Sequence, residues 1–79
     1  MADAPDIDGR TWLGAFAAEL GTAAPTDSEI DTLLDLAGVA AHDSERIAAP
    51  IACWLIGREG IDPDVALARA RAFVESRGS

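Results

Sequence analysis

The segment AAHDSERIAAP, residues 40–50, decides how the chain divides into elements. It places the polar residues 42–46 between two stretches whose apolar residues recur at helical spacing. Such a break is typical of one helix ending and the next beginning, because Asp43 or Ser44 can cap the following helix. The segment therefore predicts a junction between two helices, and its polar cluster is also a candidate site.

The helix before the junction is predicted to begin near Asp27 and to end near His42 or Asp43. Thr26 and Glu29 have the spacing of a capping box, in which each residue satisfies an orphan amide of the first turn. The apolar positions recur along one side of this helix, and they are Ile30, Leu33, Leu34, Ala37, Ala40 and Ala41. We therefore expect an amphipathic helix that packs through one face.

The segment after the junction, residues 47–57, is apolar on all sides of a helix. Either this helix begins near Ala49 with Pro50 in its first turn, where the missing amide hydrogen costs nothing, or it begins earlier and bends at Pro50. A helix without a polar face is typical of a buried position, so we predict that this third helix is the central one. Trp54 and Cys53 are then expected in the core, and Trp12, on the apolar stripe of the first predicted helix, is expected there too.

Two further helices complete the predicted fold. An apolar stripe over residues 12–20 starts with Trp12, and Gly21 can end that helix. Asp62 followed by Pro63 is a strong signal for the start of a fourth helix. We predict an all-α fold, a small bundle of four short helices with a buried apolar third helix. We predict that residues 1–8 form a flexible lead and that residues 9–77 form a single helical domain.

The composition excludes several classes of partner. The chain carries 14 acidic and 6 basic residues, a net charge of −8, which disfavours binding to nucleic acids and to anionic membranes. The longest uncharged run, residues 47–57, is too short to cross a bilayer. The acidic N-terminus lacks the apolar region of a signal peptide, and the single cysteine cannot form an intramolecular disulfide. We expect a cytoplasmic protein.

One stripe of the second predicted helix carries candidate metal ligands. Asp31, Asp35 and His42 fall on the side opposite the apolar residues, together with Gly38. Carboxylate and imidazole groups are ordinary ligands of divalent metals, so a small metal-binding protein or metalloenzyme is one alternative. The other interpretation of the stripe is a solvated helix face.

The junction itself carries the second candidate site. His42, Glu45 and Arg46 would lie beside a helix N-terminus, and such a notch can receive an anionic group. The alternative interpretation is a polar hinge between two helices. The chain contains no glycine-rich phosphate loop and no zinc motif, so we expect no catalytic residues and no cofactor.

Residues 34–57 read LDLAGVAAHDSERIAAPIACWLIG, and an early Trp12-Leu13 pair precedes them. This pattern resembles a small all-helical domain family of unknown function from actinobacteria, although Ile47 stands where that family commonly has proline. The resemblance implies domains that occur alone or fused to a guanylyltransferase-like domain of molybdopterin-guanine dinucleotide synthesis. Its motif positions point to Asp35, His42, Glu45, Arg46 and Pro50 in this chain.

The leading functional prediction is a non-catalytic accessory or adaptor domain linked to molybdenum cofactor biosynthesis. It would bind a partner enzyme, such as a molybdopterin guanylyltransferase-like protein, or an anionic ligand, with Asp35 orienting His42 and with Arg46 beside it. One alternative is the metal-binding protein or enzyme built on Asp31, Asp35 and His42. The other is a homodimerisation module whose interface is the apolar third helix.

Overall fold

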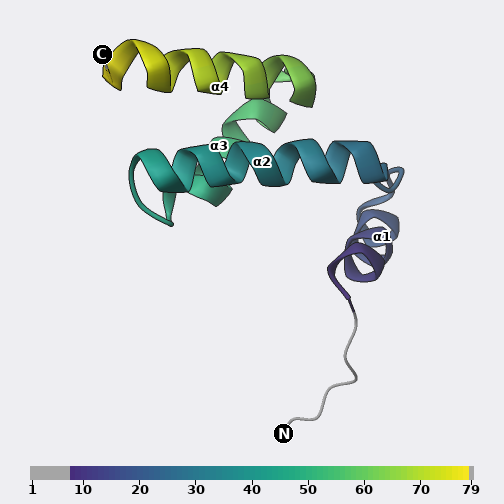
Figure 1. Ribbon diagram of the computed structural model, residues 1–79. Helices are drawn as coiled ribbons and strands as arrows, with labels where there is room; N and C mark the ends of the chain where they lie inside the picture. The colour runs from purple at the N-terminus through teal and green to yellow at the C-terminus, as the bar shows by residue number, and fades with distance from the viewer. Residues whose placement is uncertain (1–7, 79) are drawn as a thin grey trace, which may run out of the picture.

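The computed structural model describes residues 8–78, which form four α-helices joined by short loops (Figure 1). In chain order these are α1 (Gly9–Leu20), α2 (Asp27–Asp43), α3 (Ala48–Glu59) and α4 (Pro63–Gly78). No strand occurs within this range, so the predicted all-α fold of four helices is confirmed. Most of the predicted flexible lead, residues 1–7, lies outside the described residues.

The helix ends follow the capping signals of the sequence. The Asp8 carboxylate accepts a hydrogen bond from the Thr11 amide at 2.8 Å, and this bond lowers the pKa of Asp8 below its ordinary value. The capping box at the start of α2 is present in both directions, with Thr26 and Glu29 exchanging bonds of 3.0 and 2.8 Å. Gly21 ends α1 in the left-handed region at φ 77°, as its position predicts.

The start of α3 differs from the prediction, because no side chain caps it. The Ser44 hydroxyl instead donates a hydrogen bond back to the Ala40 carbonyl at 2.9 Å, so Ser44 closes α2. Capping of the third helix by Asp43 or Ser44 was therefore a wrong prediction. Pro50 lies in the first turn of α3, where proline is tolerated, as expected.

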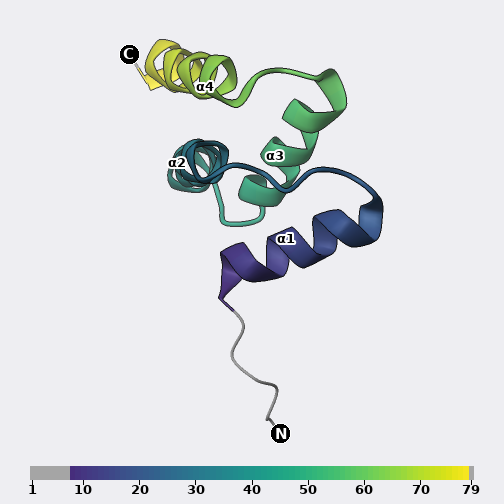
Figure 2. The same ribbon diagram turned by 90° about the vertical axis from the view of Figure 1, so that its right-hand side faces the viewer.

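The centre of the fold is α2, which packs against both α3 and α4. Figures 1 and 2 show α2 and α4 side by side, with α3 across one flank of the pair and α1 below. The most buried side chain is Leu36 of α2, which is 3% exposed. Among the described residues the buried hydrophobic core consists of Ala17, Ile30, Leu36 and Ala66.

The prediction of a buried third helix is wrong. No residue of α3 is buried, and Ile51 and Trp54 remain 57% and 59% exposed. Trp12 of α1, which was expected in the core, is 51% exposed. The longest helix, α2, takes the central place, because both α3 and α4 pack against it. A helix that is apolar on all sides is thus expected to be shielded from water. The sequence does not say whether the same chain or another protein shields it.

Shortening the central side chain should test this arrangement. We expect Leu36→Ala to lower the free energy of unfolding by about 3 kcal/mol, because it removes buried methyl groups and leaves a cavity. The matched control is Leu34→Ala on the same helix, where the side chain is 62% exposed and the expected loss is below about 0.5 kcal/mol. Urea unfolding followed by circular dichroism measures both, and equal losses would contradict the central position of Leu36.

The capping box gives a second test of local structure. Thr26→Ala should lower the free energy of unfolding by about 1 kcal/mol, because an amide in the first turn of α2 loses its acceptor. Thr22→Ala, in the loop that follows α1, is the control and should have little effect. Thermal unfolding compares the two variants. An equal effect of both would show that the capping box contributes nothing.

Candidate functional site

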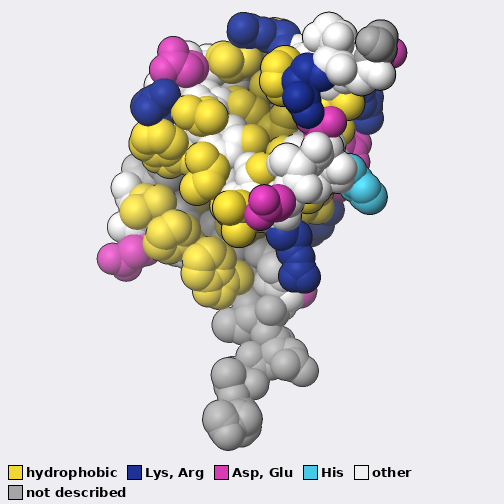
Figure 3. Space-filling view, turned by 90° about the vertical axis from the view of Figure 1, so that its left-hand side faces the viewer, with side chains coloured by type: hydrophobic (Ala, Val, Ile, Leu, Met, Phe, Trp, Pro, Cys, Tyr) yellow, Lys and Arg dark blue, Asp and Glu magenta, His cyan; other side chains and the backbone are white. Residues whose placement is uncertain are grey.

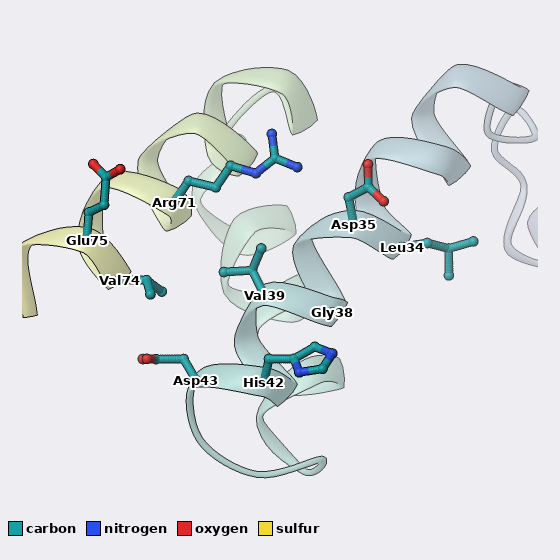
Figure 4. A pocket seen from close by; sticks show the side chains of 9 residues that line it. All are labelled: Leu34, Asp35, Gly38, Val39, His42, Asp43, Arg71, Val74 and Glu75. Atoms are coloured by element: carbon teal, nitrogen blue, oxygen red, sulfur yellow. The ribbon is translucent and has the colours of Figure 1, made fainter. Parts of the chain in front are cut away.

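A groove of about 670 Å³ lies between α2 and α4, and we call it the α2–α4 groove (Figure 4). It is lined by Leu34, Asp35, Gly38, Val39, His42, Asp43, Arg71, Val74 and Glu75. The apolar part comes from Leu34, Val39 and Val74, and the remaining side chains are charged or polar. Neither α1 nor α3 contributes to this lining, so the groove lies on the flank of the α2–α4 pair away from α3.

The charged side chains of the groove come from both helices. Asp35 and His42 belong to α2, whereas Arg71 and Glu75 belong to α4 (Figure 4). Figure 4 shows the Arg71 side chain extending from α4 toward the side of α2 that carries Asp35. At one end of the groove Arg77 forms an ion pair with the Asp43 carboxylate at 3.1 Å, and this ion pair joins α4 to the end of α2.

The structure divides the predicted patch of Asp35, His42, Glu45 and Arg46. Asp35 and His42 both line the α2–α4 groove, but seven positions of helix separate them by about 10.5 Å along the axis. A side-chain hydrogen bond cannot cross that distance, so Asp35 does not orient His42. Glu45 and Arg46 are exposed on the turn between α2 and α3, outside the groove.

The predicted metal stripe is also divided. Asp31 accepts a hydrogen bond from Arg10 at 2.7 Å, and Arg10 reaches Asp27 at 3.0 Å. The bond to Asp31 is the main cause that raises the pKa of the Arg10 guanidinium. Within residues 8–78 no group of three His, Cys, Asp or Glu side chains is placed to hold a metal ion. Asp31, the first acid of the stripe, instead joins α2 to α1 through its hydrogen bond with Arg10.

Sequence reasoning missed the roles of Arg10 and Arg71. Arg71 had been interpreted only as one of several cations near the end of a helix, where they complement the helix dipole. The helical spacing of Arg71, Val74 and Glu75 was the available signal, because it places them on one side of α4. Nothing in the sequence indicated that this side faces the Asp35 stripe of α2.

The lone thiol does not belong to the groove. Cys53 lies on α3 and is partly buried, and this burial raises the pKa of its thiol. A raised pKa keeps the sulfur protonated near neutral pH, which disfavours both nucleophilic chemistry and metal binding at this position. Cys53 therefore remains a packing residue of α3.

The fold and the groove define a small all-helical domain with a two-helix groove that is lined by apolar side chains and by side chains of both charge signs. The chain belongs to the family described as domain of unknown function (DUF6457), which matches residues 5–77. Comparison with the curated proteins finds no match, and neither does comparison with the solved structures. In the part of the chain that the structure describes, no helix has the length and apolar character needed to cross a membrane.

The separation of the three candidate metal ligands predicts that the chain holds no bound metal. Because Asp31, Asp35 and His42 are not brought together, the purified chain should retain no stoichiometric zinc or manganese after dialysis. Elemental analysis by mass spectrometry measures the metal content. One retained equivalent that is lost in both Asp35→Asn and His42→Ala, but not in Glu45→Gln, would contradict the arrangement.

Proposed function

We propose that this chain is a non-catalytic helical adaptor domain that binds a partner protein through the α2–α4 groove. The observation that carries the proposal is the composition of the groove, in which the apolar Leu34, Val39 and Val74 line the same space as charged side chains. Surfaces that combine apolar and charged side chains are typical of protein–protein interfaces. An open groove between two parallel neighbouring helices also suits an added helix or loop of a partner.

The charges favour a protein partner over a small anionic ligand. Arg71 is the main cation of the groove, but carboxylates of Asp35, Asp43 and Glu75 line the same space. Together with a net charge of −8, they oppose the approach of a free phosphate or nucleotide. A protein surface that carries both signs of charge can complement the acidic and basic side chains of the groove.

Gly38 supports close approach by a partner. It lies within α2, where glycine costs about 1 kcal/mol relative to alanine. A Cβ atom added at Gly38 would meet no atom within 4 Å, so the packing of this chain does not require glycine there. The open space above Gly38 belongs to the groove and would let a partner backbone come close to α2.

The identity of the partner rests on the sequence resemblance. We propose an enzyme of molybdopterin-guanine dinucleotide synthesis, similar to a guanylyltransferase, because the motif around residues 34–57 resembles domains associated with such enzymes. The family match carries no function of its own. The groove and the motif meet at Asp35 and His42, which belong to both.

Reversing one charge in the groove tests the proposal. The wild-type domain, used as bait in a lysate of its own organism, is expected to capture an enzyme of molybdenum cofactor assembly, identified by mass spectrometry. Arg71→Glu should reduce the capture at least tenfold, because the reversal places a fourth carboxylate in the groove. The matched control is Arg69→Glu, which makes the same change on an exposed part of α4 outside the groove and should capture normally.

The comparison of His42→Ala with Arg46→Ala separates the groove from the helix junction. Only His42 lines the groove, so only His42→Ala should weaken the capture. Equal capture by all baits would contradict the groove as the binding surface. Groove-dependent capture of a protein unrelated to molybdenum would support the adaptor function and contradict the proposed partner.

A further inference from the structure

The second surface of interest is an exposed apolar face on α1 and α3. Large hydrophobic side chains remain 42–71% exposed there, and six of them are Trp12 and Phe16 of α1, Ile47 at the N-cap of α3, and Ile51, Trp54 and Leu55 of α3. The members on each helix recur at helical spacing, so each helix presents them on one side. Figure 3 shows hydrophobic side chains gathered across this face, from α1 above the grey N-terminal residues up to α3, with charged side chains mostly at the edges.

The chain alone provides little cover for these side chains. Two of the four buried hydrophobic residues, Ala17 and Ala66, are alanines, so the buried core is small. Domains of this size are commonly reinforced by disulfides, metals or oligomerisation. The single cysteine cannot form an internal disulfide, and residues 8–78 contain no cluster placed to hold a metal. Oligomerisation is a reinforcement that is open to this fold.

The size of the apolar face fits a stable dimer. When about 150–250 Å², the range for aromatic residues, is taken for each of the six large side chains, the exposed fractions correspond to roughly 500–800 Å². The largest apolar patch of a typical monomer measures about 300–600 Å². One partner of a standard protein interface buries about 800 Å². The apolar face therefore supplies most of the surface that one protomer needs.

We propose that a second copy of this chain covers the apolar face, in a two-fold dimer that joins α1 and α3 of one protomer to α1 and α3 of its partner. A two-fold axis places the same patch on both sides, so Ile51 and Trp54 would face apolar side chains of the other copy. Arg58 lies over the Trp54 ring at 4.6 Å and pairs with Glu59 at 3.4 Å, which places a charge pair beside the ring.

The proposed dimer is independent of the adaptor function. No residue of α1 or α3 lines the α2–α4 groove, so a dimer through the apolar face leaves both grooves open. The assembly would then present two partner-binding grooves. A dimer can exist without the proposed partner, and the partner can bind without the dimer, so the two proposals succeed or fail separately.

Sedimentation equilibrium of the full chain tests the proposal. The chain has a mass of 8.2 kDa, and we expect twice that mass at micromolar and higher protein concentrations. The wild-type unfolding temperature should also rise with protein concentration, because dissociation accompanies unfolding of a dimer. A mass of 8.2 kDa at every concentration, with a constant unfolding temperature, would overturn the proposal and leave the face for a different protein.

A matched pair of variants locates the interface. Ile51→Asp places a carboxylate in the apolar face, and Leu34→Asp makes a similar change in the α2–α4 groove at comparable exposure, 57% against 62%. We expect Ile51→Asp to weaken dimerisation at least a hundredfold and Leu34→Asp to leave the dimer intact. A dimer that survives Ile51→Asp, or that is lost equally in both variants, would overturn the assignment. If Ile51→Asp does not fold, the wild-type concentration dependence still decides.

Discussion

The packing of α2 against α3 and α4 is the contact on which the rest of the structure depends. The Leu36 side chain of α2 is the most buried in the described residues, and the hollow that it lines also includes Ala52 of α3 and Ala70 of α4. Because α2 is held in this way from one side, its other side remains available for the α2–α4 groove.

The attachment of α1 has a different physical basis. Arg10 bridges Asp27 and Asp31 of α2, but these groups are largely exposed, and exposed ion pairs contribute little stability. Ala17 of α1 and Ile30 of α2 are both buried, and Leu13 of α1 lines one hollow with Ile30. Stacked Trp12 and Phe16, with ring centroids 5.0 Å apart, remain on the outer side of α1. The aromatic side chains of α1 are therefore not covered by this chain. In the proposed dimer the second copy would cover them.

Local signals in the sequence predicted where the helices begin and end. They could not predict how the helices pack against one another. The capping box at Thr26, Gly21 after the first helix and Pro63 at the start of the fourth are short-range features, so their effects could be predicted from neighbours alone. The all-round apolar α3 was predicted as central, but the hydrophobic effect does not specify which chain provides the cover. Asp35 and His42 were found from helical spacing, whereas Arg71 joins them only through the packing of α4 on α2.

The central claim is that α2, rather than the more apolar α3, forms the structural centre of this fold. Hydrogen–deuterium exchange of the full chain, resolved by residue, tests it most directly, because amides in the most stable part of a protein exchange slowest. The account predicts the slowest exchange in the middle of α2 around Leu36 and the fastest helical exchange in α1. Slowest exchange in α3, with α2 exchanging as fast as α1, would contradict it.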